Sequence, residues 1–74
     1  MMTEKELYLS KLGKRIAELR KEKGLSQNEL SYIIDCDKPN YRKIEKGKRN
    51  VTVGTLLKIS EALEISMSDL FKFE

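Results

Sequence analysis

The chain of 74 residues contains no histidine, no tryptophan and only one cysteine, Cys36. Without histidine, the usual zinc sites and the nucleophile pairs of the Ser-His or Cys-His type cannot be assembled. A single cysteine also excludes a disulfide within the chain, and we expect Cys36 to be a small buried apolar residue rather than a reactive thiol. The sequence therefore predicts no catalysis, no cofactor and no metal site.

The chain also has no long apolar run. No stretch approaches the roughly 18 apolar residues of a membrane-spanning helix, and the first residues do not form the apolar segment of a signal peptide. The sequence therefore predicts a cytoplasmic protein that does not enter a membrane. With 39% apolar residues, the chain is long enough for one small core, so we expect a single domain over residues 1–74.

Two helical segments with a tight break between them occupy the middle of the chain. Ser26 and Glu29 form the pattern of a capping box, which predicts a helix that begins at Ser26. The expected buried face of this helix is Leu30, Ile33 and Ile34. Asp37 is a candidate cap for a second helix over about residues 38–46, in which Tyr41 and Ile44 should point into the core. Pro39 disfavours helical angles at Lys38 and leaves that boundary open by one residue.

Three further amphipathic segments complete an all-α pattern. The first begins between Thr3 and Lys5 and ends at Gly24, with Leu7, Leu12, Ile16 and Leu19 on its buried stripe. Thr52 is a candidate cap for a helix over residues 53–63. The apolar surface of that helix is expected to consist of Val53, Leu56, Leu57, Ile59, Ala62 and Leu63. Ser66 should start a short last helix over about residues 67–71.

The net charge is only +3, but the positive charge is concentrated in one part of the chain. Six lysines and arginines lie between positions 37 and 50 against two carboxylates. A cluster of this kind suits the phosphates of a nucleic acid, and the alternative is a solvated, lysine-rich loop. The two helices on which the cations lie favour the nucleic acid.

Four blocks of the sequence resemble the lambda-repressor and Cro type of helix-turn-helix regulators, also called the xenobiotic-response-element family. The blocks are residues 12–16, 19–27, 44–49 and 55–63, and the resemblance covers roughly residues 12 to 71. Three positions depart from the family pattern. Asp35 stands where glycine is usual in the turn, and Val51 stands where proline is common. Ser31 occupies the position of the usual small residue that faces the second helix of the motif. Asp is among the residues that visit the left-handed region, so Asp35 is compatible with the turn.

The resemblance implies a compact five-helix, lambda-repressor-like DNA-binding domain whose helix-turn-helix motif covers about residues 26–46. In this family the first helix of the motif crosses the DNA backbone and the second enters the major groove. Base reading is therefore assigned to Lys38, Pro39, Asn40, Arg42 and Lys43. Phosphate binding is assigned to Ser26, Gln27, Lys46, Lys48, Arg49 and Asn50.

The resemblance also implies a structural ion pair. Arg20 and Glu45 lie in blocks where an arginine of the first helix pairs with a glutamate near the end of the third. We expect a partly buried, bidentate pair that ties these helices together. The alternative is a glutamate at the surface, where most carboxylates lie.

The resulting hypothesis is a sequence-specific transcriptional regulator, a repressor rather than an activator, that binds double-stranded DNA at an inverted repeat as a homodimer. The dimer contact is predicted in the C-terminal third, at Met67, Leu70, Phe71 and Phe73. The alternative for Phe73 is a ring that folds back onto its own core.

A second hypothesis comes from another class of protein. The same fold could serve mainly to bind another protein, as in an antitoxin or antagonist, and the sequence does not identify such a partner. The cation cluster of residues 38–49 beside Gln27 favours DNA, because a pure interaction module does not need it.

Overall fold

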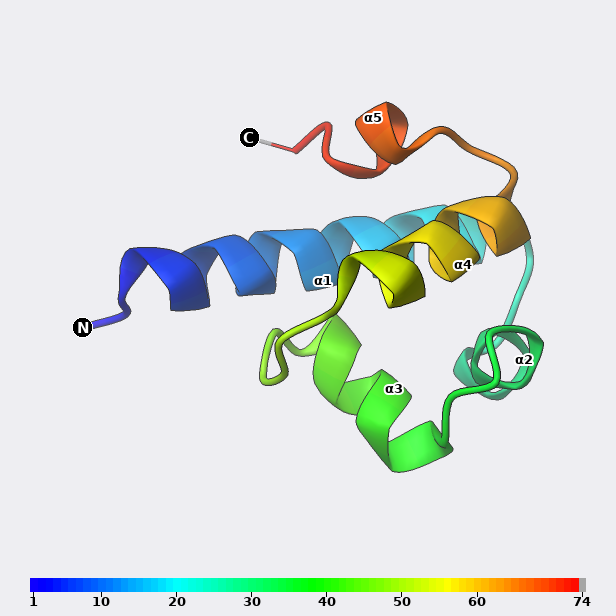
Figure 1. Ribbon diagram of the computed structural model, residues 1–74, viewed down its shortest axis with the longest axis horizontal. Coiled ribbons are helices and arrows are strands. Elements are labelled where there is room, and N and C mark those ends of the chain that lie inside the picture. The colour runs from blue at the N-terminus through cyan, green and yellow to red at the C-terminus, as the bar shows by residue number, and fades with distance from the viewer. Residues whose placement is uncertain (74) are drawn as a thin grey trace.

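Five α-helices make up the computed structural model, which describes residues 1–73 (Figure 1). They are α1 (Glu4–Glu22), α2 (Gln27–Ile33), α3 (Lys38–Glu45), α4 (Val53–Leu63) and α5 (Met67–Leu70). The long α1 runs through the middle of the molecule, with α2 and α3 on one side of it and α5 on the other. The predicted all-α fold is confirmed. No helix in residues 1–73 is both long and apolar enough to cross a membrane.

Side-chain caps start four of the five helices. At Thr3 and Ser26 both halves of a capping box are present, because the hydroxyl and the glutamate three residues later each accept a backbone amide hydrogen. Thr52 and Ser66 cap α4 and α5. Asp37 occupies the N-cap position of α3, but the predicted side-chain cap is wrong, because within the described chain its carboxylate accepts no backbone amide hydrogen. The carboxylate accepts a hydrogen bond from the side-chain amide of Asn40 instead.

Left-handed residues follow four of the five helices, and Gly47 after α3, with φ 72°, is one of them. Gly24 follows α1 with φ 78°, and the amide of Leu25 donates to the Arg20 carbonyl at 3.0 Å, as expected for a glycine-terminated helix. Asp35 adopts φ 55° in the turn after α2, which confirms that aspartate can replace glycine there. Glu64 ends α4 with φ 59°, which the sequence did not indicate.

One apolar cluster draws residues from all five helices. It consists of Leu12, Ile16, Leu30, Ile34, Tyr41, Ile44, Leu56, Ile59, Leu63 and Leu70. Tyr41 and Ile44 are both buried, as predicted. The backbones of α1 and α3 touch at Gly13, where an added Cβ would lie 2.4 Å from the Glu45 carbonyl oxygen. Any larger residue at position 13 would therefore push the end of α3 away from α1.

Four residues that were predicted to be buried lie at the surface. Leu7 is exposed because the first turns of α1 extend beyond the other helices (Figure 1). Ile33 is exposed because it is the last residue of α2 and the following residue, Ile34, takes the place in the core. Val53 and Leu57 are exposed because α4 buries a narrower stripe than expected, formed by Leu56, Ile59, Ser60 and Leu63.

Candidate nucleic-acid interface

The carboxylate of Glu45, the last residue of α3, accepts hydrogen bonds from three side chains. Arg20 of α1 donates from Nε to Oε2 at 2.6 Å and from Nη2 to Oε1 at 3.2 Å. Gln27 at the start of α2 donates from Nε2 to Oε1 at 2.9 Å, and the Tyr41 hydroxyl donates to Oε2. We call these four residues the Glu45 network. Since they come from α1, α2 and α3, the network joins the two helices of the motif to the longest helix.

The Glu45 network is nearly closed to solvent, because the side chains of Arg20 and Glu45 are only 8% and 7% exposed. Burial raises the pKa of the Glu45 carboxyl, but hydrogen bonds from Arg20, Tyr41 and Gln27 outweigh this and place the pKa below its usual value. The hydrogen bond to Glu45 raises the pKa of Arg20. Burial, and the hydrogen bond from its own hydroxyl to Glu45, raise the pKa of Tyr41. A buried ion pair with a neutral tyrosine results.

Polar and cationic side chains cover the side of α3 that faces away from the core. We call the following set the reading face: Lys38, Pro39, Asn40, Arg42 and Lys43 from α3, with Lys46, Lys48, Arg49 and Asn50 from the segment after it. All are exposed except Asn40, which is half-buried. Burial of Tyr41 and Ile44 turns this face outward, and Lys38 lies inside the first turn of α3, which settles the boundary left open by Pro39.

Ser26 and Gln27 lie at the start of α2, but their polar groups are largely engaged. The Ser26 hydroxyl accepts from the amide of Glu29, and the Ser26 amide donates to the Glu29 carboxylate. One proton of the Gln27 amide is donated to Glu45. The second proton remains to donate to a phosphate.

Asn40, a predicted base-reading residue, uses both ends of its amide within the protein. Its Nδ2 donates to Asp37 Oδ1 at 2.5 Å, and its Oδ1 accepts from Arg49 Nη1 at 3.0 Å. A carboxylate, an amide and a guanidinium are therefore linked in a row at the start of α3.

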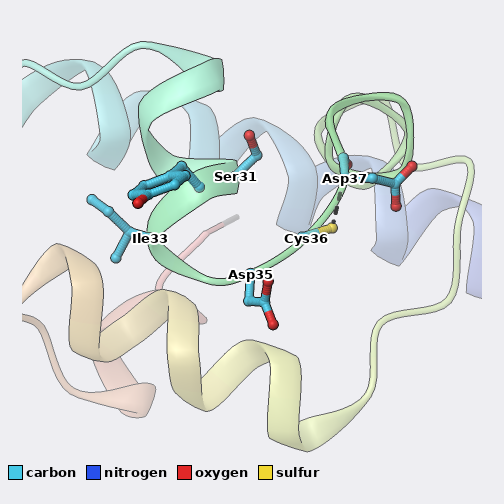
Figure 2. A pocket seen from close by; sticks show the side chains of 6 residues that line it. Ser31, Ile33, Asp35, Cys36 and Asp37 are labelled. Carbon is cyan, nitrogen blue, oxygen red and sulfur yellow. Dashed lines mark hydrogen bonds between the residues drawn. The ribbon is translucent and has the colours of Figure 1, made fainter.

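The turn between α2 and α3 borders a shallow hollow of about 580 Å³, shown in Figure 2. Cys36 is half-buried there, more exposed than predicted, and its Sγ lies 3.6 Å from the Asp37 carbonyl oxygen. Burial, followed by the charge of Asp37, raises the pKa of the thiol. Since the carboxylates of Asp35 and Asp37 border the hollow, it does not favour a phosphate.

The predicted dimer residues occupy different environments. Leu70 is fully buried, so it closes the core of its own protomer and is not available to a partner, which corrects that assignment. Met67, Phe71 and Phe73 are half-buried. The Phe73 ring packs edge-on against Tyr8 of α1 with 5.1 Å between ring centroids, so it folds back onto the protomer.

The sequence did not predict the hydrogen bonds from Gln27 to Glu45 and from Arg49 to Asn40, nor two further interactions that hold helices together. The Tyr41 hydroxyl joins the Glu45 network, and the spacing of four residues between Tyr41 and Glu45 was a usable signal, since it places both on one side of a helix. Arg15 donates from Nε and Nη2 to the Asp69 carbonyl oxygen at 3.2 and 3.0 Å and holds α5 against α1. No sequence signal reveals that bond, because its acceptor is a backbone atom.

Comparison with known proteins places this geometry in a family. The helix-turn-helix family matches the chain over residues 16–70, which is more than half of its length. The chain is a helix-turn-helix DNA-binding regulator of the lambda-repressor type. The predicted resemblance is thereby confirmed.

The regulator is similar to controller proteins. It is 47% identical over 62 residues to the control protein C.MunI of a Mycoplasma species, which covers 82% of this chain and 84% of that protein. The crystal structure of the restriction-modification controller protein C.AhdI from Aeromonas hydrophila matches with a TM-score of 0.82 and 41% identity, over 85% of this chain and 96% of that one. The controller C.Esp1396I matches with a TM-score of 0.79 and 35% identity, over 88% and 84%. These relatives are named as control or controller proteins and not as enzymes, in agreement with the prediction of a non-catalytic protein.

The Glu45 network generates a pH-dependent prediction. Because the pKa of Glu45 is lowered on folding, its stabilising effect should be present above the usual carboxyl pKa and be lost as the pH falls through the lowered value. Glu45→Gln should reduce the free energy of unfolding by about 3 kcal/mol at pH 7, since it leaves the buried Arg20 charge poorly compensated. Denaturant unfolding at several pH values should show the difference from the parent shrinking below pH 4.

The control for this experiment is Glu61→Gln, which removes an exposed carboxylate of α4. It should change the free energy of unfolding by less than about 0.5 kcal/mol. A Glu45→Gln variant as stable as this control, or a difference that stays constant down to pH 3, would contradict the assigned role of the carboxylate.

Proposed function

We propose that this regulator binds an inverted-repeat operator as a homodimer and represses transcription from it. The observation that carries the proposal is the reading face, an exposed set of cations and hydrogen-bonding groups on a helix that the Glu45 network holds in place. In helix-turn-helix proteins this helix lies in the major groove, and its first residues contact base edges. Lys38, Arg42 and Lys43 would then donate to base edges, with Pro39 beside a thymine methyl group.

The phosphates on either side of the groove would be bound by groups that flank α3. Lys46, Lys48 and Asn50 lie exposed after its end, and the free proton of Gln27 lies at the start of α2. Ser26 takes part less directly, since its hydroxyl caps α2 and so places the first amides of that helix. Contacts to phosphate fix the register of the protein on DNA and contribute equally to all sequences.

Repression is the simplest outcome for a protein whose described surface serves to bind DNA. A dimer bound over a promoter blocks access to it by bulk alone, whereas activation needs an additional surface that contacts the transcription machinery. The similarity to C.MunI and C.AhdI supports a role like that of the controller proteins, in the control of restriction-modification genes. The regulator spans only about half the length of some other curated relatives, so this role is drawn from the relatives of similar length.

Selection of bound sites from random duplex DNA tests the function directly. It should enrich an inverted repeat, and the log of the affinity should fall steeply as the log of the salt concentration rises.

Lys48→Ala should weaken binding to selected and random duplexes alike and flatten the salt dependence by about one unit. Lys14→Ala is a matched control, because Lys14 is an exposed lysine that borders a hollow with Lys72 and Phe73 and is not part of the reading face. Absence of duplex binding at low salt would remove the proposed function in favour of a protein-interaction module.

The dimer is proposed from specificity and from the surface of the C-terminal third. One α3 covers only a few base pairs, and two such helices spaced about 34 Å apart would read a palindromic site. Met67, Phe71 and Phe73 remain half-exposed around α5 and offer a partner an apolar contact. Exposed apolar side chains also lie on α4, at Val53 and Leu57, and mark the competing surface.

Paired substitutions distinguish the two surfaces. Phe71→Ser should lower the fraction of dimer in sedimentation equilibrium and reduce affinity for the full palindrome more than for a single half-site. Leu57→Ser, which alters an exposed residue of α4, should leave both properties unchanged. The opposite pattern would move the interface to α4, and a parent that binds a half-site as tightly as the palindrome would exclude a dimer.

A further inference from the structure

The side chain of Arg49 lies back along α3 rather than away from it. Arg49 follows α3 by four residues, yet its Nη1 donates to Asn40, which is the third residue of that helix. The guanidinium therefore reaches from the loop after α3 to its first turn. In helix-turn-helix proteins that turn contacts the base edges, whereas the loop after the helix faces the phosphates.

The hydrogen bonds of Asn40 and Arg49 give the two side chains different capacities to contact a base. Reading adenine with an asparagine needs the amide donor and the amide acceptor aligned with the base, and in Asn40 the bonds to Asp37 and Arg49 already set the orientation of that amide. Arg49 donates only this one hydrogen bond within residues 1–73, so most of its five N–H groups remain free. A guanidinium presents them in a rigid fork that matches the O6 and N7 atoms of guanine.

We infer that Arg49 reads a guanine in each half-site and that Asn40, oriented by Asp37, is the positioning residue that holds its guanidinium over the first turn of α3. This inference rests on the proposed DNA-binding function and reverses the expected roles of the two residues. Asn40 stops the long arginine side chain from moving toward the phosphates. Arg49 thereby adds to the reading face a base contact that comes from outside α3.

Base preferences measured on a set of singly substituted operators test the inference. Arg49→Lys keeps the charge and loses the fork, so it should lower the preference for guanine at one base pair of each half-site by about 5- to 150-fold. Affinity for random duplex and its salt dependence should stay within about twofold of the parent. Lys14→Arg, the reciprocal exchange at an exposed lysine outside the reading face, is the control and should leave every base preference unchanged.

Asn40→Ala should weaken the preference at the same base pair, and adding it to Arg49→Lys should cause little further loss, because the two residues act as a unit. An Arg49→Lys variant with unchanged preferences would overturn the inference. So would an Asn40→Ala variant that loses its preference at a different, A·T base pair.

A measurement without DNA separates this inference from the proposed function. In the free protein, Arg49→Lys should shift the side-chain amide resonances of Asn40, since the hydrogen bond to its Oδ1 is lost. Unchanged resonances would overturn the positioning of Arg49 even if the parent binds DNA. If the resonances shift in the variant but the parent protein binds no duplex, the proposed function is overturned, and base reading with it. The contact between Asn40 and Arg49 would still stand.

Discussion

The position of α3 depends on one buried carboxylate. A helix of eight residues is marginal in isolation, so tertiary contacts must decide where it lies. Apolar packing of Tyr41 and Ile44 holds α3 on the core, but such contacts are not directional. The Glu45 network is directional, because the planar guanidinium of Arg20 and the amide of Gln27 accept only a narrow range of positions for the carboxylate. The backbone contact at Gly13 completes the constraint.

This constraint determines what the surface can do. Burying one side of α3 turns its polar side toward solvent, and fixing its last residue fixes where the following loop begins. From that loop Arg49 reaches the first turn of α3 and meets Asn40. The reading face therefore consists of α3 and the loop after it, and the Glu45 network fixes the position of both. A charged network also has a thermodynamic cost, since burying both ions requires desolvating them.

The sequence allowed much of this fold to be predicted, because its strongest signals are local. Capping boxes at Thr3 and Ser26 and the glycine after α1 depend only on neighbouring residues, and all three were found where expected. Periodicity was less reliable, as Ile33 and Leu57 show. It identifies the apolar side of a helix but not how much of that side another element covers, and α4 is covered over a narrower stripe than its sequence suggests.

The candidate site was predictable only in part. Arg20 and Glu45 followed from the family resemblance, since a sequence separation of 25 residues leaves no local signal for their pairing. The bond between Asn40 and Arg49 depends on how the loop after α3 turns back, and that path is set by Gly47, which adopts φ 72° and lies against the backbone of α1 at Ser10. Tertiary geometry of this kind leaves no pattern in a single sequence.

The central claim, that the carboxylate of Glu45 and the guanidinium of Arg20 act as one structural unit, is tested most directly by a double-mutant cycle. Arg20→Met and Glu45→Leu would be made separately and together, and the free energy of unfolding would be measured for each. The account predicts that the double variant recovers much of the loss caused by the single ones, with a coupling free energy of about 0.5 to 3 kcal/mol. Strictly additive losses would contradict it, because they would show that the two side chains stabilise the fold independently.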